Sequence, residues 1–157
     1  MMRVSLAMVG LAAVTSSVVA AGCSAPEHRI ELAMEPATDG PACTMTELGE
    51  VRVISVELLG IADGKPCSLG KRCVFDVGTL ASLDDVAALL AEVNQPLVDV
   101  ADDDAHTVAV IGHRESCWGT GDHAMCGYAD LAEVQDGALA VPVSCTACPD
   151  DEILFCP

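Results

Sequence analysis

Aromatic residues are scarce in this chain of 157 residues, which contains two phenylalanines, one tyrosine and one tryptophan. A hydrophobic core must therefore consist mainly of Val, Leu, Ile and Ala. Surfaces that bind carbohydrate or single-stranded nucleic acid use exposed aromatic platforms, on which bases, for example, stack. The scarcity disfavours both classes of function, although an exposed Trp118 would weaken this objection.

Positive charge is also scarce. Seven Lys/Arg residues stand against 24 Asp/Glu residues, and the formal net charge is −17. Nucleic-acid binding depends on cationic groups that neutralise phosphates, so this class of partner is excluded. Adsorption to anionic lipid is disfavoured for the same reason. A cationic partner or divalent metal ions remain compatible with the charge.

The common catalytic motifs are absent. The chain has no Gly-x-Ser-x-Gly turn, no His-Glu-x-x-His helix and no glycine-rich phosphate loop. His113 with Glu115, or His123 with Asp122, would supply an acid and a base for a hydrolase. Such neighbours arise readily in an acidic chain with four histidines. An enzymatic function is disfavoured, and no cofactor is predicted.

The first 22 residues have the three parts of a secretory signal peptide. Arg3 supplies the positive start, residues 4–14 are apolar, and residues 15–22 are mostly small. The apolar part is shorter than the ~18 residues needed to span a bilayer. An uncleaved membrane helix running to Gly22 is the alternative.

Residues 19–23, Val-Ala-Ala-Gly-Cys, resemble a bacterial lipobox. The resemblance implies cleavage before Cys23 and attachment of a diacylglycerol to its sulfur, usually with a third acyl chain on the new amino group. Two or more acyl chains anchor a protein stably. By analogy with lipoprotein sorting, Ser24 favours the outer membrane over the inner. Ala20 replaces the leucine most common at that position, and plain secretion after Ala21 is the alternative.

The number of cysteines favours the lipoprotein. There are nine, so plain secretion would leave an odd thiol in an oxidising compartment. Lipidation of Cys23 leaves eight for four disulfides: Cys43, Cys67, Cys73, Cys117, Cys126, Cys145, Cys148 and Cys156. Proximity in sequence predicts local Cys67–Cys73 and Cys117–Cys126 bridges. The other four cysteines would then tie the N-terminal tether and the C-terminus to the fold.

Patterning divides the chain into a signal peptide (1–22), a lipidated cysteine with a flexible, proline-containing tether (23–42) and one domain (43–157). Within the domain, a helix is expected from Ser82 to Asn94. Ser82 and Asp85 form a weak capping box at its start. Alternation or apolar runs predict strands at 51–59, 73–77, 97–100, 107–112, 128–134 and 138–143. The expected fold is α+β, a small disulfide-linked antiparallel sheet with one amphipathic helix on one face.

Two groups of residues are candidate metal ligands. His113, Cys117, His123 and Cys126 share one loop, and two imidazoles with two thiolates suit tetrahedral zinc, although the spacing matches no established zinc-finger pattern. An exported protein favours oxidised cysteines instead. A turn containing Asp99, Asp102, Asp103 and Asp104 offers hard oxygen ligands to calcium. A solvated acidic turn is the alternative for that segment.

Cys145-Thr146-Ala147-Cys148 has the spacing of a thiol–disulfide redox motif. A thioredoxin-like arrangement needs the motif to open a helix, but too little chain follows it for that fold.

Taken together, these patterns predict an envelope lipoprotein held by lipid on Cys23, with a non-catalytic domain that binds an unknown protein or small ligand or has a structural role. A metal-binding lipoprotein and a Cys145/Cys148 oxidoreductase are the alternatives.

Overall fold

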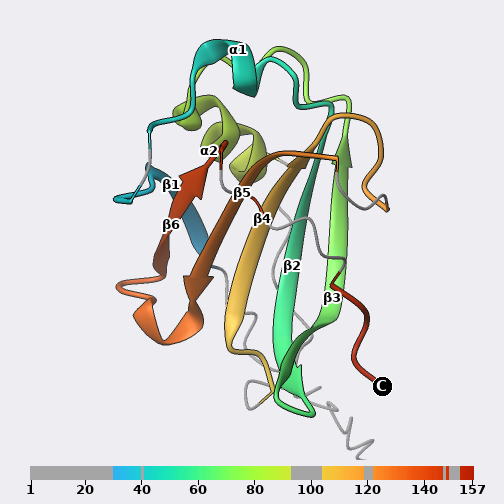
Figure 1. Cartoon of the computed structure of the whole chain (residues 1–157). Helices are drawn as coiled ribbons and strands as arrows, with labels where there is room; N and C mark the ends of the chain where they lie inside the picture. The colour runs from blue at the N-terminus through green and yellow to red at the C-terminus, as the bar shows by residue number, and fades with distance from the viewer. Residues whose placement is uncertain (1–29, 40, 93–103, 119–121, 147, 149–152) are drawn as a thin grey trace, which may run out of the picture.

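The computed structural model describes residues 30–39, 41–92, 104–118, 122–146, 148 and 153–157. In this part of the chain six strands form one mixed sheet, and α2 is the one helix of more than seven residues (Figure 1). No helix within these residues is long and apolar enough to cross a membrane. The elements are β1 (Glu31–Pro36), α1 (Met45–Leu48), β2 (Val53–Ala62), β3 (Lys65–Phe75), α2 (Leu83–Glu92), β4 (Thr107–His113), β5 (His123–Asp130), a 3₁₀ turn η1 (Leu131–Glu133) and β6 (Ala138–Ser144).

The strands lie in the order β1-β6-β5-β4-β2-β3. β1 runs parallel to β6, and all other neighbours are antiparallel. The expectation of a purely antiparallel sheet is therefore wrong at this edge. The parallel pair joins segments from opposite ends of the described chain, and no local pattern signals such pairing.

The expected flexible tether at 23–42 contains β1, so the prediction is wrong for residues 31–36. Met34 is buried in the core, and Leu32 packs against it from the same side of the strand. The sequence prediction missed this short alternation of apolar residues, because prolines and acidic residues surround it. The sheet thus begins before residue 43.

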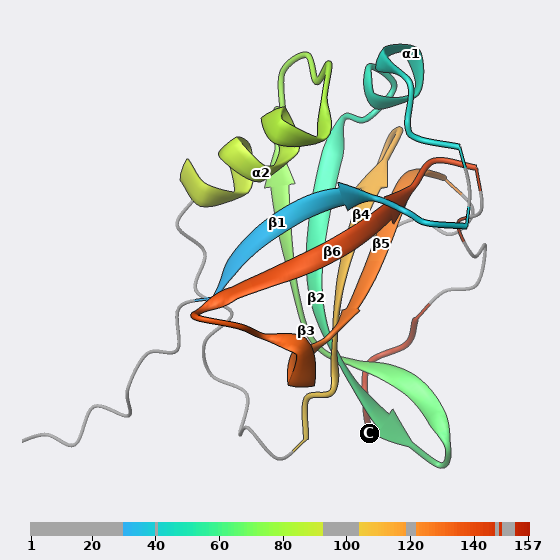
Figure 2. The same cartoon turned by 90° about the vertical axis from the view of Figure 1, so that its left-hand side faces the viewer.

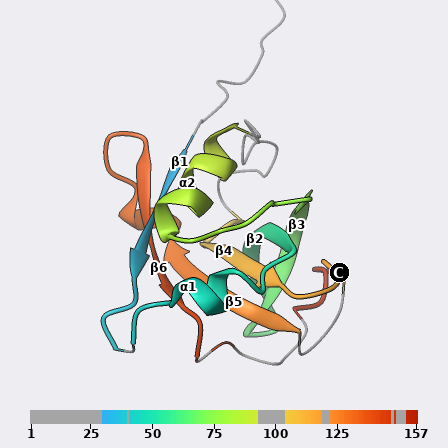
Figure 3. The ribbon, with the colours of Figure 1, turned by 90° about the horizontal axis from the view of Figure 1, so that it is seen from above.

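One face of the sheet carries the main apolar core. Alternate residues of β2 point to this face, namely Ile54, Val56 and Leu58. They meet buried aliphatic side chains of β3, β4 and β6, and Val86 of α2 packs on them. Figures 2 and 3 show α2 on this side of the sheet, next to β1.

The predicted start of α2 is confirmed. The Asp85 carboxylate accepts from the Ser82 backbone N–H at 2.9 Å, and the Asp85 N–H donates to Ser82 Oγ at 3.2 Å. This reciprocal cap satisfies backbone donors that a helix leaves unpaired at its N-terminus. Leu83, Leu89 and Leu90 pack against the core on either side of Val86, as the helical spacing predicts.

Two tight turns are formed by Asp-Gly pairs. Asp63 and Gly64 both have positive φ, and they join β2 to β3. Asp136 and Gly137 adopt the same conformation before β6. Left-handed backbone of this kind suits two-residue turns and favours Asp and Gly.

Several strand boundaries differ from expectation. β3 starts eight residues before Cys73, because the hairpin with β2 extends the pairing along the whole strand. β5 starts at His123 and ends at Asp130, whereas a strand was predicted at 128–134. The strand stops there because the Asp130 side chain caps the 3₁₀ turn η1, which follows it. The strand predicted at residues 97–100 lies outside the described residues.

Candidate functional site

The face of the sheet opposite α2 carries an unexpected buried polar network. Ser55, Glu57 and His113 are at most 1 % exposed, although polar residues that alternate with apolar ones, as Ser55 and Glu57 do in β2, are typical of the solvated face of a strand. Residues Ile153 and Tyr128 pack on this side against a second apolar cluster in β2 and β4. The C-terminal residues and α2 therefore lie on opposite sides of the sheet (Figure 3).

The register of the sheet brings the network together. Glu57 of β2 pairs with Lys71 of β3, and Val53 of β2 pairs with His113 of β4. Lys71 Nζ lies 2.9 Å from Glu57 Oε1, and Ser55 Oγ lies 3.2 Å from the same oxygen. His113 Nε2 lies 3.0 Å from Ser55 Oγ. The polar chain thus runs from an ammonium group to an imidazole across three strands.

Proton counting assigns the direction of these bonds. The Glu57 carboxylate, paired with Lys71, only accepts, so the single Ser55 hydroxyl hydrogen points to Glu57. Ser55 Oγ then accepts from His113 Nε2–H. The serine is engaged by a carboxylate, and the imidazole donates to it. This is the reverse of the arrangement that activates a serine nucleophile.

His113 is held neutral. Burial lowers its pKa from 6.5 to about 4, and electrostatic interactions with Lys71 and His123 act in the same direction against a smaller opposing effect of Asp122. Its Nδ1 has no hydrogen-bond partner among the described residues. The ring packs edge-on against His123, with 5.2 Å between ring centroids. Burial also raises the pKa of Tyr128 on the same face, with a further contribution from the negative charge of Glu57.

Lys71 links this network to the surface. Its side chain is 14 % exposed, and Nζ lies 5.5 Å from the centroid of the Trp118 ring. The Cys73–Cys117 disulfide fixes the loop that carries Trp118 to β3. Arg114 holds the start of the same loop by donating to Glu50 at 2.8 Å and to the His123 carbonyl at 2.8 Å. The indole therefore sits on a braced loop above a cation.

Three of the four aromatic side chains are exposed beside β3. Phe75, Trp118 and Phe155 are 59–61 % exposed, and we call them the aromatic surface. Phe75 ends β3, Trp118 lies near Lys71, and Phe155 forms a β-bridge with Ser68 of β3. The fourth aromatic residue, Tyr128, is half-buried on the same side of the sheet. The apolar core contains no aromatic residue.

All eight cysteines after Cys23 form disulfides, but the two local pairings predicted from sequence are wrong. The bonds join Cys43 to Cys145, Cys67 to Cys156, Cys73 to Cys117 and Cys126 to Cys148. Cys67 and Cys73 lie on one extended strand, where six residues span ~20 Å. A disulfide needs Cα atoms within ~7 Å, so nearness in sequence is misleading here.

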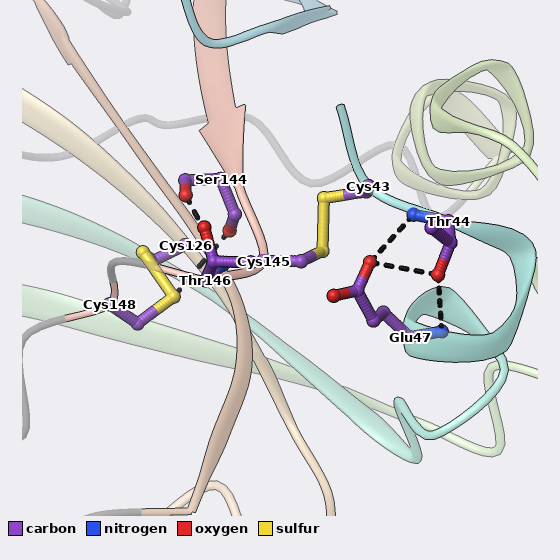
Figure 4. Close-up of a disulfide and its surroundings, with 8 residues drawn as sticks. All are labelled: Cys43, Thr44, Glu47, Cys126, Ser144, Cys145, Thr146 and Cys148. Atoms are coloured by element: carbon purple, nitrogen blue, oxygen red, sulfur yellow. Dashed lines mark hydrogen bonds between the residues drawn. A yellow bond between two sulfur atoms is a disulfide. The ribbon is translucent and has the colours of Figure 1, made fainter. Parts of the chain in front are cut away.

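Two of these disulfides lie side by side at one end of the sheet (Figure 4). Cys145 and Cys148 of the redox-like motif bond to Cys43 and Cys126 respectively, and not to each other. Next to Cys43, Thr44 and Glu47 cap α1 reciprocally, with the Thr44 N–H 2.7 Å from Glu47 Oε2. Thr44-x-x-Glu47 is a capping signature that the sequence prediction missed.

The candidate metal ligands are only partly brought together. His113 and His123 are in contact, but Cys117 and Cys126 are in disulfides with other partners and offer no thiolate to zinc. Asp104 is exposed, whereas Asp99, Asp102 and Asp103 lie outside the described residues. Over the described ranges, no three His, Cys, Asp or Glu residues form a group that could hold a metal ion.

One of the two acid–base pairs suggested by sequence neighbours, His113 with Glu115, does not form an open catalytic pair. Glu115 is exposed on the loop, whereas His113 is buried. The Asp122 carboxylate accepts from the Glu115 backbone N–H, so it braces the loop. Ser55, Glu57 and Lys71 were not predicted, and their only signal was a serine and an acid alternating on one face of a strand.

Comparison with known proteins adds no identity: no protein-family description, curated protein or solved structure matches this chain.

Proposed function

We propose that this protein is a lipid-anchored protein of the bacterial cell envelope whose disulfide-bonded domain binds a partner and catalyses no reaction. The anchor is the acylated Cys23, and Ser24 favours the outer membrane. The pairing of all other cysteines supports this assignment, since it leaves Cys23 as the odd one of nine.

The observation that carries the binding role is the aromatic surface. A chain with four aromatic residues exposes three of them beside one strand, at 59–61 % each, while its core uses none. Aromatic side chains are enriched at binding sites, and two of these three, Trp118 and Phe75, lie at the same half of β3. Trp118 is fixed by a disulfide-braced loop, so this surface is preorganised.

The reactive groups support binding over catalysis. Ser55 is fully buried, with its hydroxyl hydrogen directed to Glu57, and His113 donates to it. Both sulfurs of the redox-like motif are held in separate disulfides. Neither the serine of the buried network nor the sulfurs of the redox-like motif are therefore available as an exposed nucleophile.

Metal binding is the second candidate, because His113 and His123 are in contact and His113 Nδ1 lacks a partner among the described residues. Two imidazoles make an incomplete zinc site, so any such binding would be weak. A zinc titration monitored by thermal unfolding tests this, with His123→Ala as the variant expected to abolish any shift.

The fluorescence of Trp118 tests the binding role, since it is the chain's single tryptophan. Envelope protein and envelope polysaccharide fractions are titrated separately into the purified full chain. We expect one fraction to shift the emission to shorter wavelength and to protect the indole from acrylamide quenching. A Trp118→Phe/Ala132→Trp variant is the matched control, because residue 132 is exposed in η1, away from β3. The role of this surface would be refuted if the emission of Trp118 and that of the control tryptophan introduced by Ala132→Trp shifted equally. It would also be refuted if neither emission shifted.

The anchor is tested by the intact mass of the membrane-extracted protein. Lipid mass on residue 23, with no thiol available to an alkylating agent before reduction, is the expected result. A Cys23→Ser variant should be released from membranes. Retention of that variant would rule out the lipid anchor.

A further inference from the structure

The outer edge of β3 already accepts an extended segment of this chain. β3 is the last strand of the sheet, and the Ser68 N–H donates to the Leu154 carbonyl at 2.7 Å. The Cys156 N–H returns a bond to the Ser68 carbonyl at 2.9 Å, which gives a parallel bridge between Ser68 and Phe155. The Cys67–Cys156 disulfide secures this contact. The edge is therefore competent for strand pairing.

Beyond Ser68 the same edge has no strand partner within the described part of the chain. Residues 70–75 pair with β2 on the inner side, and with no other strand among the described residues. Figure 1 shows the C-terminal segment beside the lower part of β3 only. Unpaired strand edges are templates for addition of another strand. Trp118 and Phe75, both exposed, lie at this open half of the strand.

The charge of β3 contrasts with that of the whole protein. The strand from Lys65 to Phe75 holds three of the seven Lys/Arg residues and none of the 24 Asp/Glu residues. Lys71 is paired with Glu57, whereas Lys65 and Arg72 are exposed and form no ion pair with any described residue. The edge thus presents positive charge on a molecule of net charge −17.

This charge argues against a second copy in a symmetric β3–β3 pair. Such a pair would bring the cationic side chains of two copies together, and two strongly acidic molecules also repel each other. The opposite edge, β1, has α2 beside it and ends in a proline, so it is a poorer template. A partner of opposite local charge fits the open edge of β3 better.

We propose that residues 70–75 of β3 bind an extended acidic peptide segment of a partner protein, which adds to the sheet as a further strand. Backbone hydrogen bonds supply the strand pairing. Alternate apolar side chains of the peptide contact Phe75 and Trp118, and its acidic residues meet Arg72. This inference rests on the binding role proposed above and names the class of partner.

The test uses the full chain in detergent and labelled ten-residue peptides in which valine alternates with aspartate or, for comparison, with lysine. We expect the aspartate peptide to bind and to shift Trp118 emission, and the lysine peptide to bind at least tenfold more weakly. Two further aspartate peptides are N-methylated at odd or at even positions only. One should lose at least tenfold in affinity and the other should keep it, because a strand uses the N–H groups of one edge only.

Arg72→Glu should weaken binding of the aspartate peptide at least tenfold. Lys65→Glu is the matched control, since it makes the same charge change on the same strand beyond the occupied Ser68 position, and it should change affinity less than threefold. Equal binding of both N-methylated peptides, or of the lysine peptide, would overturn strand addition. Concentration-dependent self-association abolished by Arg72→Glu would assign the edge to a second copy and also overturn it.

The outcomes separate this inference from the binding role. If an envelope fraction protects Trp118 but no aspartate peptide binds, the acidic strand is wrong and the binding role stands. If neither binds, both are wrong.

Discussion

Lys71→Met is the substitution that most directly tests the buried network. Lys71 Nζ and Glu57 Oε1 are 2.9 Å apart, and the Glu57 side chain is 2 % exposed. At an effective dielectric constant of ~20, the Coulomb attraction over this distance is roughly 6 kcal/mol. Most of this attraction offsets the desolvation of the two charges. Removing the lysine alone therefore leaves a buried carboxylate without its counter-charge.

We expect Lys71→Met to lower the free energy of unfolding by about 3–5 kcal/mol. The double variant Glu57→Leu/Lys71→Met should lie within about 1.5 kcal/mol of the parent, because neither charge is then buried. The Ser55 hydroxyl can turn to donate to His113 Nε2 in that variant. Lys65→Met, on the same strand but exposed, is the control and should change stability by less than about 0.5 kcal/mol.

The assay is urea unfolding followed by far-ultraviolet circular dichroism with the disulfides intact. The denaturant slope should be equal in all variants, so that midpoint shifts report stability. A loss below about 1 kcal/mol for Lys71→Met would refute the reasoning, because it would mean that water reaches Glu57 and the ion pair is only superficial. A double variant as unstable as the single one would also contradict it.

Three further predictions follow from the fold. Folding lowers the pKa of His113 from 6.5 to about 4, so the unfolded state binds more protons between these two pH values. The contribution of the neutral imidazole to the free energy of unfolding should be fully present above pH 6.5. It should fall towards pH 4 by at most about 1.4 kcal/mol per pH unit. His113→Gln should remove this fall, and identical pH profiles of the two proteins would contradict the burial of the imidazole. Non-reducing peptide mapping should recover a peptide pair joining Cys67 to Cys156, and a Cys67–Cys73 peptide would refute the arrangement of the tail on β3. Ser82→Ala should destabilise the protein by about 1 kcal/mol through loss of the α2 cap, measured by the same urea unfolding, and an unchanged midpoint would show that the cap is not formed.

Local elements followed from the sequence because their causes are local. The cap at Ser82 and Asp85 depends on residues three apart, and the Asp63-Gly64 turn depends on the conformational freedom of its own two residues. The alternation of Ile54, Val56 and Leu58 likewise fixed which side of β2 meets the core.

The candidate site could not be predicted in the same way. In the sequence, Ser55 and Glu57 alternate with apolar residues as solvent-facing residues of a strand would. They are buried because Lys71, the loop after β4 and the C-terminal residues, which are distant in sequence, pack on this side of the sheet. The aromatic surface also gathers residues from distant positions, namely 75, 118 and 155. Sequence spacing contains no signal for such a gathering.

What the sequence by itself determined is the acidic charge, the number of cysteines and the local caps and turns, since each depends on composition or on neighbours along the chain. Only the tertiary structure decided which cysteines pair, that β1 joins the sheet parallel to β6, and that the cationic strand β3 lies at the edge of the sheet with aromatic side chains beside it. The physical reason is that these features depend on strand order and register, which bring together residues up to about a hundred positions apart, such as Cys43 and Cys145 with a separation of 102.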